Sequence, residues 1–202
     1  YRVEISGTFP HLYSDRYSSR NPYQLKLQSV EQWGDIEWSS MENAFWEARN
    51  VVINATDAPD LSNVTTMESM FDGAVSVNSD LNHWDVSNVE NMRRLFFATY
   101  YDGSEFNGDI SSWDVSNVTQ MAHMFQNANS FNGDLSSWDV SNVEDMTEMF
   151  AEAASFNSDI SGWDVSNVRY MPGMFFNATS FNQDIGDWDV SNVEDMGTIP
   201  YS

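Results

Sequence analysis

Apolar and polar positions follow one another in a fixed order that recurs along the second half of the chain. In residues 110–115 the first, fourth and sixth positions are apolar, held by Ile110, Trp113 and Val115. A short strand with one face on the core gives this spacing, because successive strand side chains point to opposite faces. We therefore expect a short strand here, with the Trp113 indole inside and Asp114 outside.

The residues that follow have a different spacing. After Ser116, apolar side chains recur at steps of three and four, at Val118, Met121, Met124, Phe125 and Ala128. These steps place the side chains on one face of a helix. Ser116 stands at the N-cap position, and three sister repeats complete an S-x-x-E capping box, at Ser87 and Glu90, Ser141 and Glu144, and Ser191 and Glu194. We expect one short helix per repeat.

The whole unit recurs along the chain. Five copies contain the sequence WDVSNV, and the last four of their tryptophans are 25 residues apart: Trp84, Trp113, Trp138, Trp163 and Trp188. An Asn-x-Asp pair precedes each copy, and both residue types favour tight turns. A period of about 20 to 50 residues indicates units stacked on their own copies. We predict an α/β, leucine-rich-repeat-like solenoid, with one short parallel strand and one short helix per 25-residue repeat and an irregular N-terminal cap.

The repeats divide the chain into three parts. Residues 59–202 form the regular array. Residues 33–58 form a degenerate first repeat, because Met41, Ala44, Phe45 and Ala48 keep the helical spacing. Residues 1–32 break the pattern and are predicted to cap the open end with a short strand pair, drawn from the alternating residues Val3 and Ile5 and Leu25 and Leu27.

Composition narrows the classes of partner. The chain has 31 Asp and Glu against 8 Lys and Arg, a formal net charge of -23, and 14% aromatic residues. The aromatic content argues for a folded core, and the charge repels phosphate backbones and anionic lipid headgroups. Nucleic acid and membrane surfaces are therefore not expected as partners, whereas basic ligands are favoured. Membrane insertion is not expected either, because no apolar run approaches 18 residues. The absence of cysteine excludes disulfides and thiolate chemistry.

One aspartate per repeat occupies an outward position of the predicted strand: Asp85, Asp114, Asp139, Asp164 and Asp189. Parallel strands lie about 4.8 Å apart, so such a column brings like charges close together. Two interpretations stay open. Serine hydroxyls and backbone amides of each repeat could bind the carboxylates. Alternatively, Ca²⁺ could be bound at Asp114, Asp139 and Asp164, because it prefers oxygen ligands. No other cofactor is expected.

Three further residues are candidate ligand contacts. His83 holds an outward strand position. Tyr100 and Tyr101 lie in a loop, residues 98–105, that is four residues longer than its counterpart in the next repeat. Loops that interrupt a rigid array often carry recognition residues, although a tolerated insertion explains the extra length equally well.

The pattern WDVSNVxxMxxMFxxAxxFNxDIxxW resembles the repeat of BspA-type leucine-rich-repeat surface proteins. That family is also known as a domain of unknown function common in mycoplasma lipoproteins and marine bacterial secreted proteins. The resemblance covers about residues 30–200. It implies a bacterial extracellular or cell-surface module for binding and adhesion, often within longer proteins, and it brings no catalytic residue.

Two functions from different classes follow. The first is a non-enzymatic adhesion module, in which the strand face and the tyrosine loop hold a peptide, a glycan or a basic protein ligand. The alternative is a structural spacer or fibre-forming element that stacks through its ends, onto further repeats or domains of the same polypeptide. An enzyme is least favoured, because the three histidines occupy unrelated positions and no nucleophile or phosphate-loop motif is present.

Overall fold

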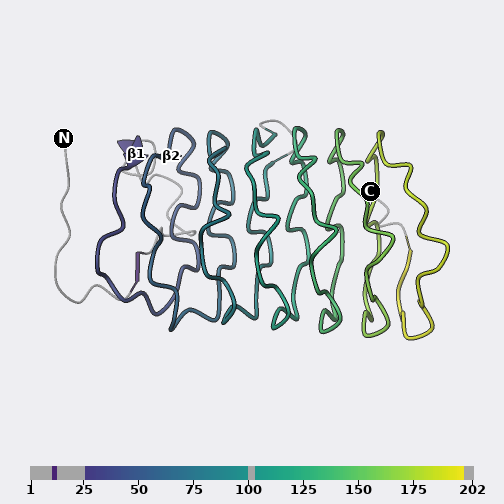
Figure 1. The fold of residues 1–202 in the computed structure, drawn as a ribbon. Coiled ribbons are helices and arrows are strands. Elements are labelled where there is room, and N and C mark those ends of the chain that lie inside the picture. Colours follow the sequence, from purple (N-terminus) through teal and green to yellow (C-terminus); the bar gives the residue numbers. More distant parts are fainter. Residues whose placement is uncertain (1–10, 13–25, 100–102, 198–202) are drawn as a thin grey trace.

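A computed structural model describes residues 11–12, 26–99 and 103–197 of the 202-residue chain. The chain runs through a row of similar circuits that lie side by side, from the purple N-terminal end to the yellow C-terminal end (Figure 1). Each circuit is called a rung below and is named by its tryptophan. Backbone hydrogen bonds join each rung to the next, so every rung rests on its neighbours.

Regular secondary structure is short in the described residues. Strand β1 (Ser29–Val30) pairs in parallel with strand β2 (Val52–Ile53), in the register Ser29 to Val52 and Val30 to Ile53. Beyond β2, single parallel bridges continue from rung to rung through Thr66, Asn91, Gln120, Asp145, Tyr170 and Asp195. These bridges follow the WDVSNV sequence and do not lie within it.

The predicted strand at residues 110–115 is absent. The Trp113 amide donates to the Ile110 carbonyl at 3.2 Å, and the Val118 amide donates to the Val115 carbonyl at 2.9 Å. The segment is therefore a pair of tight turns with an extended piece between them. The prediction of which side chains face inward was nevertheless confirmed, because Trp113 is 3% exposed and Asp114 is exposed.

The predicted helix is also absent, since the described residues contain no α-helix. Between Met121 and Ala128 every second amide donates to the following rung, as His123 does to Thr147 at 2.7 Å and Phe125 to Met149 at 2.9 Å. The amides between them close turns within the rung. In an α-helix, each backbone amide donates to a carbonyl of the same helix, so no amide is left for a neighbouring rung. An α-helix also requires negative φ at every residue.

In most rungs two residues break that second requirement. His123 and Asn127 have φ of 60° and 59°, and Glu148 and Glu152 repeat this in the next rung at 48° and 61°. The left-handed region turns the backbone away from a helical path. The proposed capping boxes are wrong for the same reason, since no helix begins at Ser116 for its side chain to cap.

The core consists of columns of one residue type. The phenylalanines at the predicted helix face stack from rung to rung, with Phe125 and Phe150 at 5.5 Å between ring centroids and 2° between planes. A second phenylalanine column and the tryptophans stack in the same way, as in Phe131 on Phe156 and Trp113 on Trp138. Met121 and Met146 are fully buried in the same core. Aromatic and methionine burial is thus repeated in each rung.

The leucine-rich-repeat-like class stays a prediction, because the described residues show neither a strand nor a helix in each rung. The three-part division of the chain likewise stays a prediction. Most of the predicted cap lies outside the described residues, including Val3, Ile5 and Leu25 of its proposed strand pair.

Candidate binding face

The aspartate that follows each buried tryptophan is exposed and held by its own rung. Its Oδ1 accepts the backbone N–H of the serine two residues later. In the Trp84 rung the Ser87 amide lies 3.1 Å and the Ser87 hydroxyl 2.6 Å from Asp85 Oδ1. The Asp85, Asp114, Asp139, Asp164 and Asp189 column is therefore a column of closed turns, and the hydrogen-bonding interpretation of it is confirmed.

These hydrogen bonds favour the charged carboxylates. The serine hydroxyl and then the serine amide hold the pKa of Asp85, Asp139, Asp164 and Asp189 below the ordinary value. The neighbouring Asp164 carboxylate opposes this effect at Asp139 and Asp189 by raising their pKa. The donors prevail over the repulsion, so four members of the column keep their charge at neutral pH.

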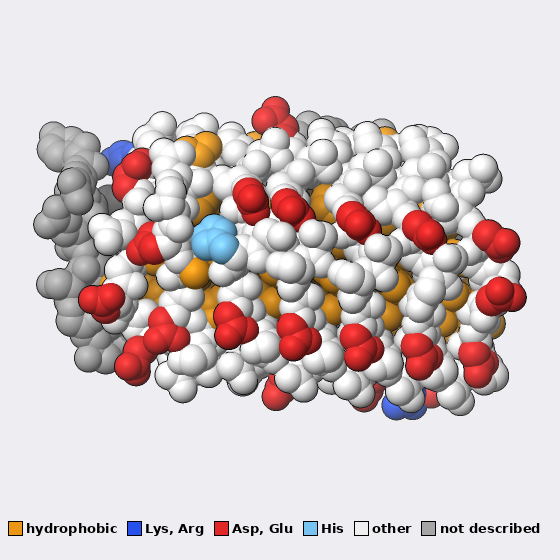
Figure 2. Space-filling model, viewed as in Figure 1, with side chains coloured by type: hydrophobic (Ala, Val, Ile, Leu, Met, Phe, Trp, Pro, Cys, Tyr) orange, Lys and Arg blue, Asp and Glu red, His pale blue; other side chains and the backbone are white. Residues whose placement is uncertain are grey.

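A second aspartate column has the same geometry. Each Asp of the Asn-x-Asp pair accepts the amide two residues later through Oδ1, at Asp80, Asp109, Asp134, Asp159 and Asp184. The two columns are five residues apart in the sequence of every rung. Figure 2 shows acidic side chains in two rows along the length of one face. The second column was predicted as a set of turns but not as part of a binding face.

Two asparagine ladders fix the rungs beneath these rows. The side-chain oxygens of Asn107, Asn132 and Asn157 each accept the backbone amide of the equivalent asparagine one rung on, at 2.7 to 2.8 Å. The asparagine of each WDVSNV sequence contacts the preceding rung instead, and its side chain is the donor. Asn142 Nδ2, for example, donates to the Ser116 carbonyl at 2.7 Å. The asparagines hold the exposed aspartates of successive rungs in register.

The sequence-predicted contacts are only partly brought together. His83 is exposed, and its Nε2 lies 3.4 Å from the Asp57 carbonyl of the preceding rung. Tyr100 and Tyr101 lie outside the described residues. No group of three or more His, Asp or Glu among the described residues is placed to hold a metal ion. Calcium at Asp114, Asp139 and Asp164 therefore stays a prediction.

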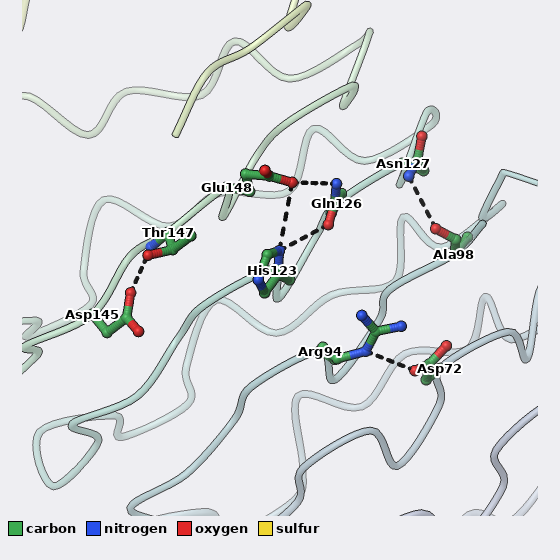
Figure 3. A network of polar contacts seen from close by, with 9 residues as sticks. All are labelled: Asp72, Arg94, Ala98, His123, Gln126, Asn127, Asp145, Thr147 and Glu148. Atoms are coloured by element: carbon green, nitrogen blue, oxygen red, sulfur yellow. Dashed lines mark hydrogen bonds and ion pairs between the residues drawn. The ribbon is translucent and has the colours of Figure 1, made fainter. Parts of the chain in front are cut away.

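A buried polar network, missed from the sequence, lies at the left-handed positions (Figure 3). His123 Nδ1 lies 2.9 Å from Gln126 Oε1 and 3.6 Å from Glu148 Oε2, and Gln126 Nε2 also donates to Glu148. Burial is the main cause that lowers the pKa of His123, although Gln126 and Glu148 oppose it. These contacts make His123, Gln126 and Glu148 a packed polar cluster that joins two rungs.

A second ion pair lies nearby on the preceding rungs. Arg94 Nε donates to Asp72 Oδ2 at 2.9 Å, and the Arg94 guanidinium lies over the Phe97 ring at 3.6 Å from its centroid. Asp72 is only 2% exposed, so its charge is compensated inside the protein. These residues differ from rung to rung, so no repeated pattern in the sequence indicates them.

Comparison with known families gives a direct result. The chain matches the family described as "Mycoplasma protein of unknown function, DUF285" twice, over residues 15–103 and 97–201. It therefore belongs to this family, which supports a bacterial surface-type protein in general terms and names no activity or ligand. No curated protein and no solved structure gives a significant match. The described residues contain no helix that is long and apolar enough to cross a membrane.

Proposed function

We propose that the chain is a non-enzymatic binding module of the BspA-type leucine-rich-repeat kind, outside the cell or on its surface, that holds a basic peptide segment on its aspartate rows. The observation that carries this proposal is the pair of aspartate columns. Their carboxylates are exposed, hydrogen-bonded in one orientation and repeated once per rung. A fixed array of charges loses little side-chain entropy when a ligand binds.

Electrostatics favour a basic ligand over the other candidates. The formal net charge of -23 attracts cationic groups and speeds their encounter with the protein. The rungs repeat at about the 4.8 Å spacing of paired parallel strands, whereas alternate side chains of an extended peptide recur at about 6.6 to 6.8 Å. A flexible lysine or arginine side chain can accommodate this difference, and each exposed ion pair contributes about 0.2 to 1 kcal/mol.

The test is binding of a fluorescent lysine- and arginine-rich peptide by anisotropy at two salt concentrations. The triple variant Asp114→Asn, Asp139→Asn and Asp164→Asn keeps the Oδ1 acceptor of each turn and removes three charges. We expect it to weaken binding about three- to tenfold, and high salt to weaken the unaltered protein as well. The matched control replaces three carboxylates outside both columns, Glu68→Gln, Glu105→Gln and Glu152→Gln.

If the control variant binds the peptide as weakly as the triple variant does, net charge alone explains the effect. That result would contradict specific binding at the aspartate rows. Salt-independent binding of a neutral peptide or a glycan, retained in the triple variant, would overturn the proposal. Tyr101→Ala is a separate arm of the experiment. It reports whether the tyrosine loop contributes to the same binding.

A further inference from the structure

One boundary between early rungs lacks the side-chain bonds that join the later rungs. Pro59 holds the tryptophan position 25 residues before Trp84. The boundary between this Pro59 rung and the Trp84 rung is called the seam below. Each of the four later boundaries has an indole bond, a bond of the Asn-x-Asp ladder and a bond from a WDVSNV asparagine. At the first of them, Trp113 Nε1 donates to the Leu81 carbonyl at 2.9 Å.

None of these three bonds forms at the seam among the residues that the structure describes. Trp84 Nε1 is buried without a hydrogen-bond partner. Asn88 is the equivalent of Asn117, which bonds the preceding rung, but the Asn88 side chain forms no such bond with the Pro59 rung. In the Asn-x-Asp ladder, Val52 precedes Asn78 and offers no side-chain acceptor for the Asn78 amide. The seam is therefore weakly joined on the side of the aspartate rows.

The side of the seam formed by residues 66–73 and 91–98 is joined firmly. Arg94 of the Trp84 rung pairs with the buried Asp72 of the Pro59 rung at 2.9 Å (Figure 3). On the aspartate side, Ser79 Oγ donates to the Ile53 carbonyl at 2.6 Å. Four backbone amides of the Pro59 rung also donate to the Trp84 rung at 2.9 to 3.0 Å, those of Met67, Ser69, Phe71 and Gly73.

The boundary before the seam is joined on the aspartate side as well. The Asp57 carboxylate accepts the Trp33 amide at 3.1 Å and the Gly34 amide at 2.8 Å. These bonds hold the Trp33 rung and the Pro59 rung together as a pair. Across the seam, the Asp57 carbonyl lies 3.4 Å from His83 Nε2, which is a longer contact. The seam thus separates a joined pair of rungs from a joined array.

We propose that the seam is a hinge, at which the Trp33 and Pro59 rungs open as a unit from the Trp84 rung on the aspartate side. Opening exposes the Trp33 and Trp84 indoles, which meet edge to face at 5.3 Å between ring centroids. It also separates Asp85 from Asp60, whose Oδ1 closes the same kind of turn in the Pro59 rung. A basic peptide that contacts both aspartates favours the closed seam, and this consequence alone rests on the proposed function.

The test is hydrogen exchange of the tryptophan indole N–H groups, followed by NMR in the unaltered protein. Trp84 and Trp138 are both 3% exposed, so their exchange depends on opening of the structure. We expect the Trp84 indole to exchange about tenfold faster than the Trp138 indole, or more, because local opening is easiest at the seam. The Trp38 amide donates to the Asp60 carbonyl within the pair of rungs at 3.2 Å and should stay protected.

A disulfide across the seam is the second arm of the experiment. The chain has no cysteine, and Asn63 and Asn88 are exposed at equivalent positions of adjacent rungs. Such positions lie about 4.8 Å apart, within the range of about 4.4 to 6.8 Å that a disulfide spans. In the variant Asn63→Cys with Asn88→Cys, oxidation should slow Trp84 indole exchange about tenfold, and reduction should restore it. The matched control, Asn142→Cys with Asn167→Cys, places the disulfide at a later boundary and should leave Trp84 exchange unchanged.

Equal exchange of the Trp84 and Trp138 indoles in the unaltered protein would overturn the proposal, as would Trp84 exchange that the seam disulfide leaves unchanged. Equal slowing by the control disulfide would assign the opening to the whole array and also overturn it. If the Trp38 amide loses protection together with the Trp84 indole, the rungs unfold one by one and do not open as a pair. None of these measurements involves peptide binding, so the hinge and the proposed function can fail separately.

Discussion

The Trp138 indole Nε1 donates a hydrogen bond of 3.1 Å to the Ile110 carbonyl in the preceding rung. The same bond recurs at Trp113, Trp163 and Trp188. It joins two functions in one side chain, because the ring fills the core while the N–H satisfies a carbonyl at the rung boundary. The tryptophan column therefore holds neighbouring rungs together as well as filling them.

Trp84 provides the matched exception. It is 3% exposed, like Trp113 and Trp138, but its Nε1 has no hydrogen-bond partner in the described residues. We expect Trp138→Phe to lower the free energy of unfolding by about 1 to 2 kcal/mol more than Trp84→Phe. Both changes remove similar ring volume, and only the first leaves a carbonyl without its indole donor. Urea denaturation followed by circular dichroism measures the difference, and equal losses would contradict the role of the indole bond.

The left-handed positions lead to a second prediction. Gly173 has a φ of 62°, and a Cβ there would meet the Glu148 side chain at 3.2 Å. We expect Gly173→Ala to lower the free energy of unfolding by about 1 to 2 kcal/mol, the usual penalty of a left-handed residue with a Cβ. Gly162→Ala is the control, because a Cβ there meets nothing within 4 Å. Equal thermal midpoints of the two variants would contradict a penalty for the left-handed backbone at Gly173.

The inward and outward sides of the repeat could be predicted from sequence, but its backbone could not. The 25-residue period and the position of each tryptophan determine which side chains are buried, whatever the local conformation. The spacing of Met121, Met124, Phe125 and Ala128 fits a helix equally well as a series of turns that each close over three residues. Hydrogen bonds to the next rung favour the turns over the helix, and the sequence of a single repeat does not reveal these bonds.

A signal for the turns was nevertheless present in the sequence. Some of the left-handed positions carry Asn or Gly, the residue types that tolerate positive φ, namely Asn43, Gly73, Asn127, Gly173 and Asn177. Other residue types at the remaining left-handed positions hide this signal: Glu47, Ser69, Arg94, His123, Glu148 and Glu152. The aspartate face was found because its residues are identical in every rung, whereas the polar network of His123 was missed because it occurs once.

A third prediction concerns the aspartate turns. The Ser87 hydroxyl and amide lower the pKa of Asp85, so the folded state binds that proton less readily than the unfolded state does. The resulting stability is present above the ordinary value of 3.8 and is lost as the pH falls through the lower folded pKa. We expect Ser87→Ala to raise the pKa of Asp85, measured by carboxyl NMR titration. An unchanged pKa would show that the hydroxyl does not contribute.

The last prediction concerns the buried histidine. His123 has a lowered pKa, chiefly because burial disfavours the imidazolium, with Arg93 and Arg94 adding repulsion and Gln126 and Glu148 opposing the shift. The unfolded state therefore binds the proton more readily, and stability is complete above the ordinary value of 6.5 and declines as the pH falls below it. We expect the urea concentration at the midpoint of unfolding to decrease when the pH is lowered from 7.5 to 5.5.

His123→Asn is the informative variant for this prediction, because asparagine tolerates the φ of 60° at this position and does not titrate. It should remove most of the dependence between pH 7.5 and pH 5.5 while the array still melts cooperatively. His83→Asn is the matched control, since His83 is exposed and lies outside the buried network. A slope that persists in His123→Asn would assign the pH dependence to the carboxylates and contradict a role for the buried imidazole.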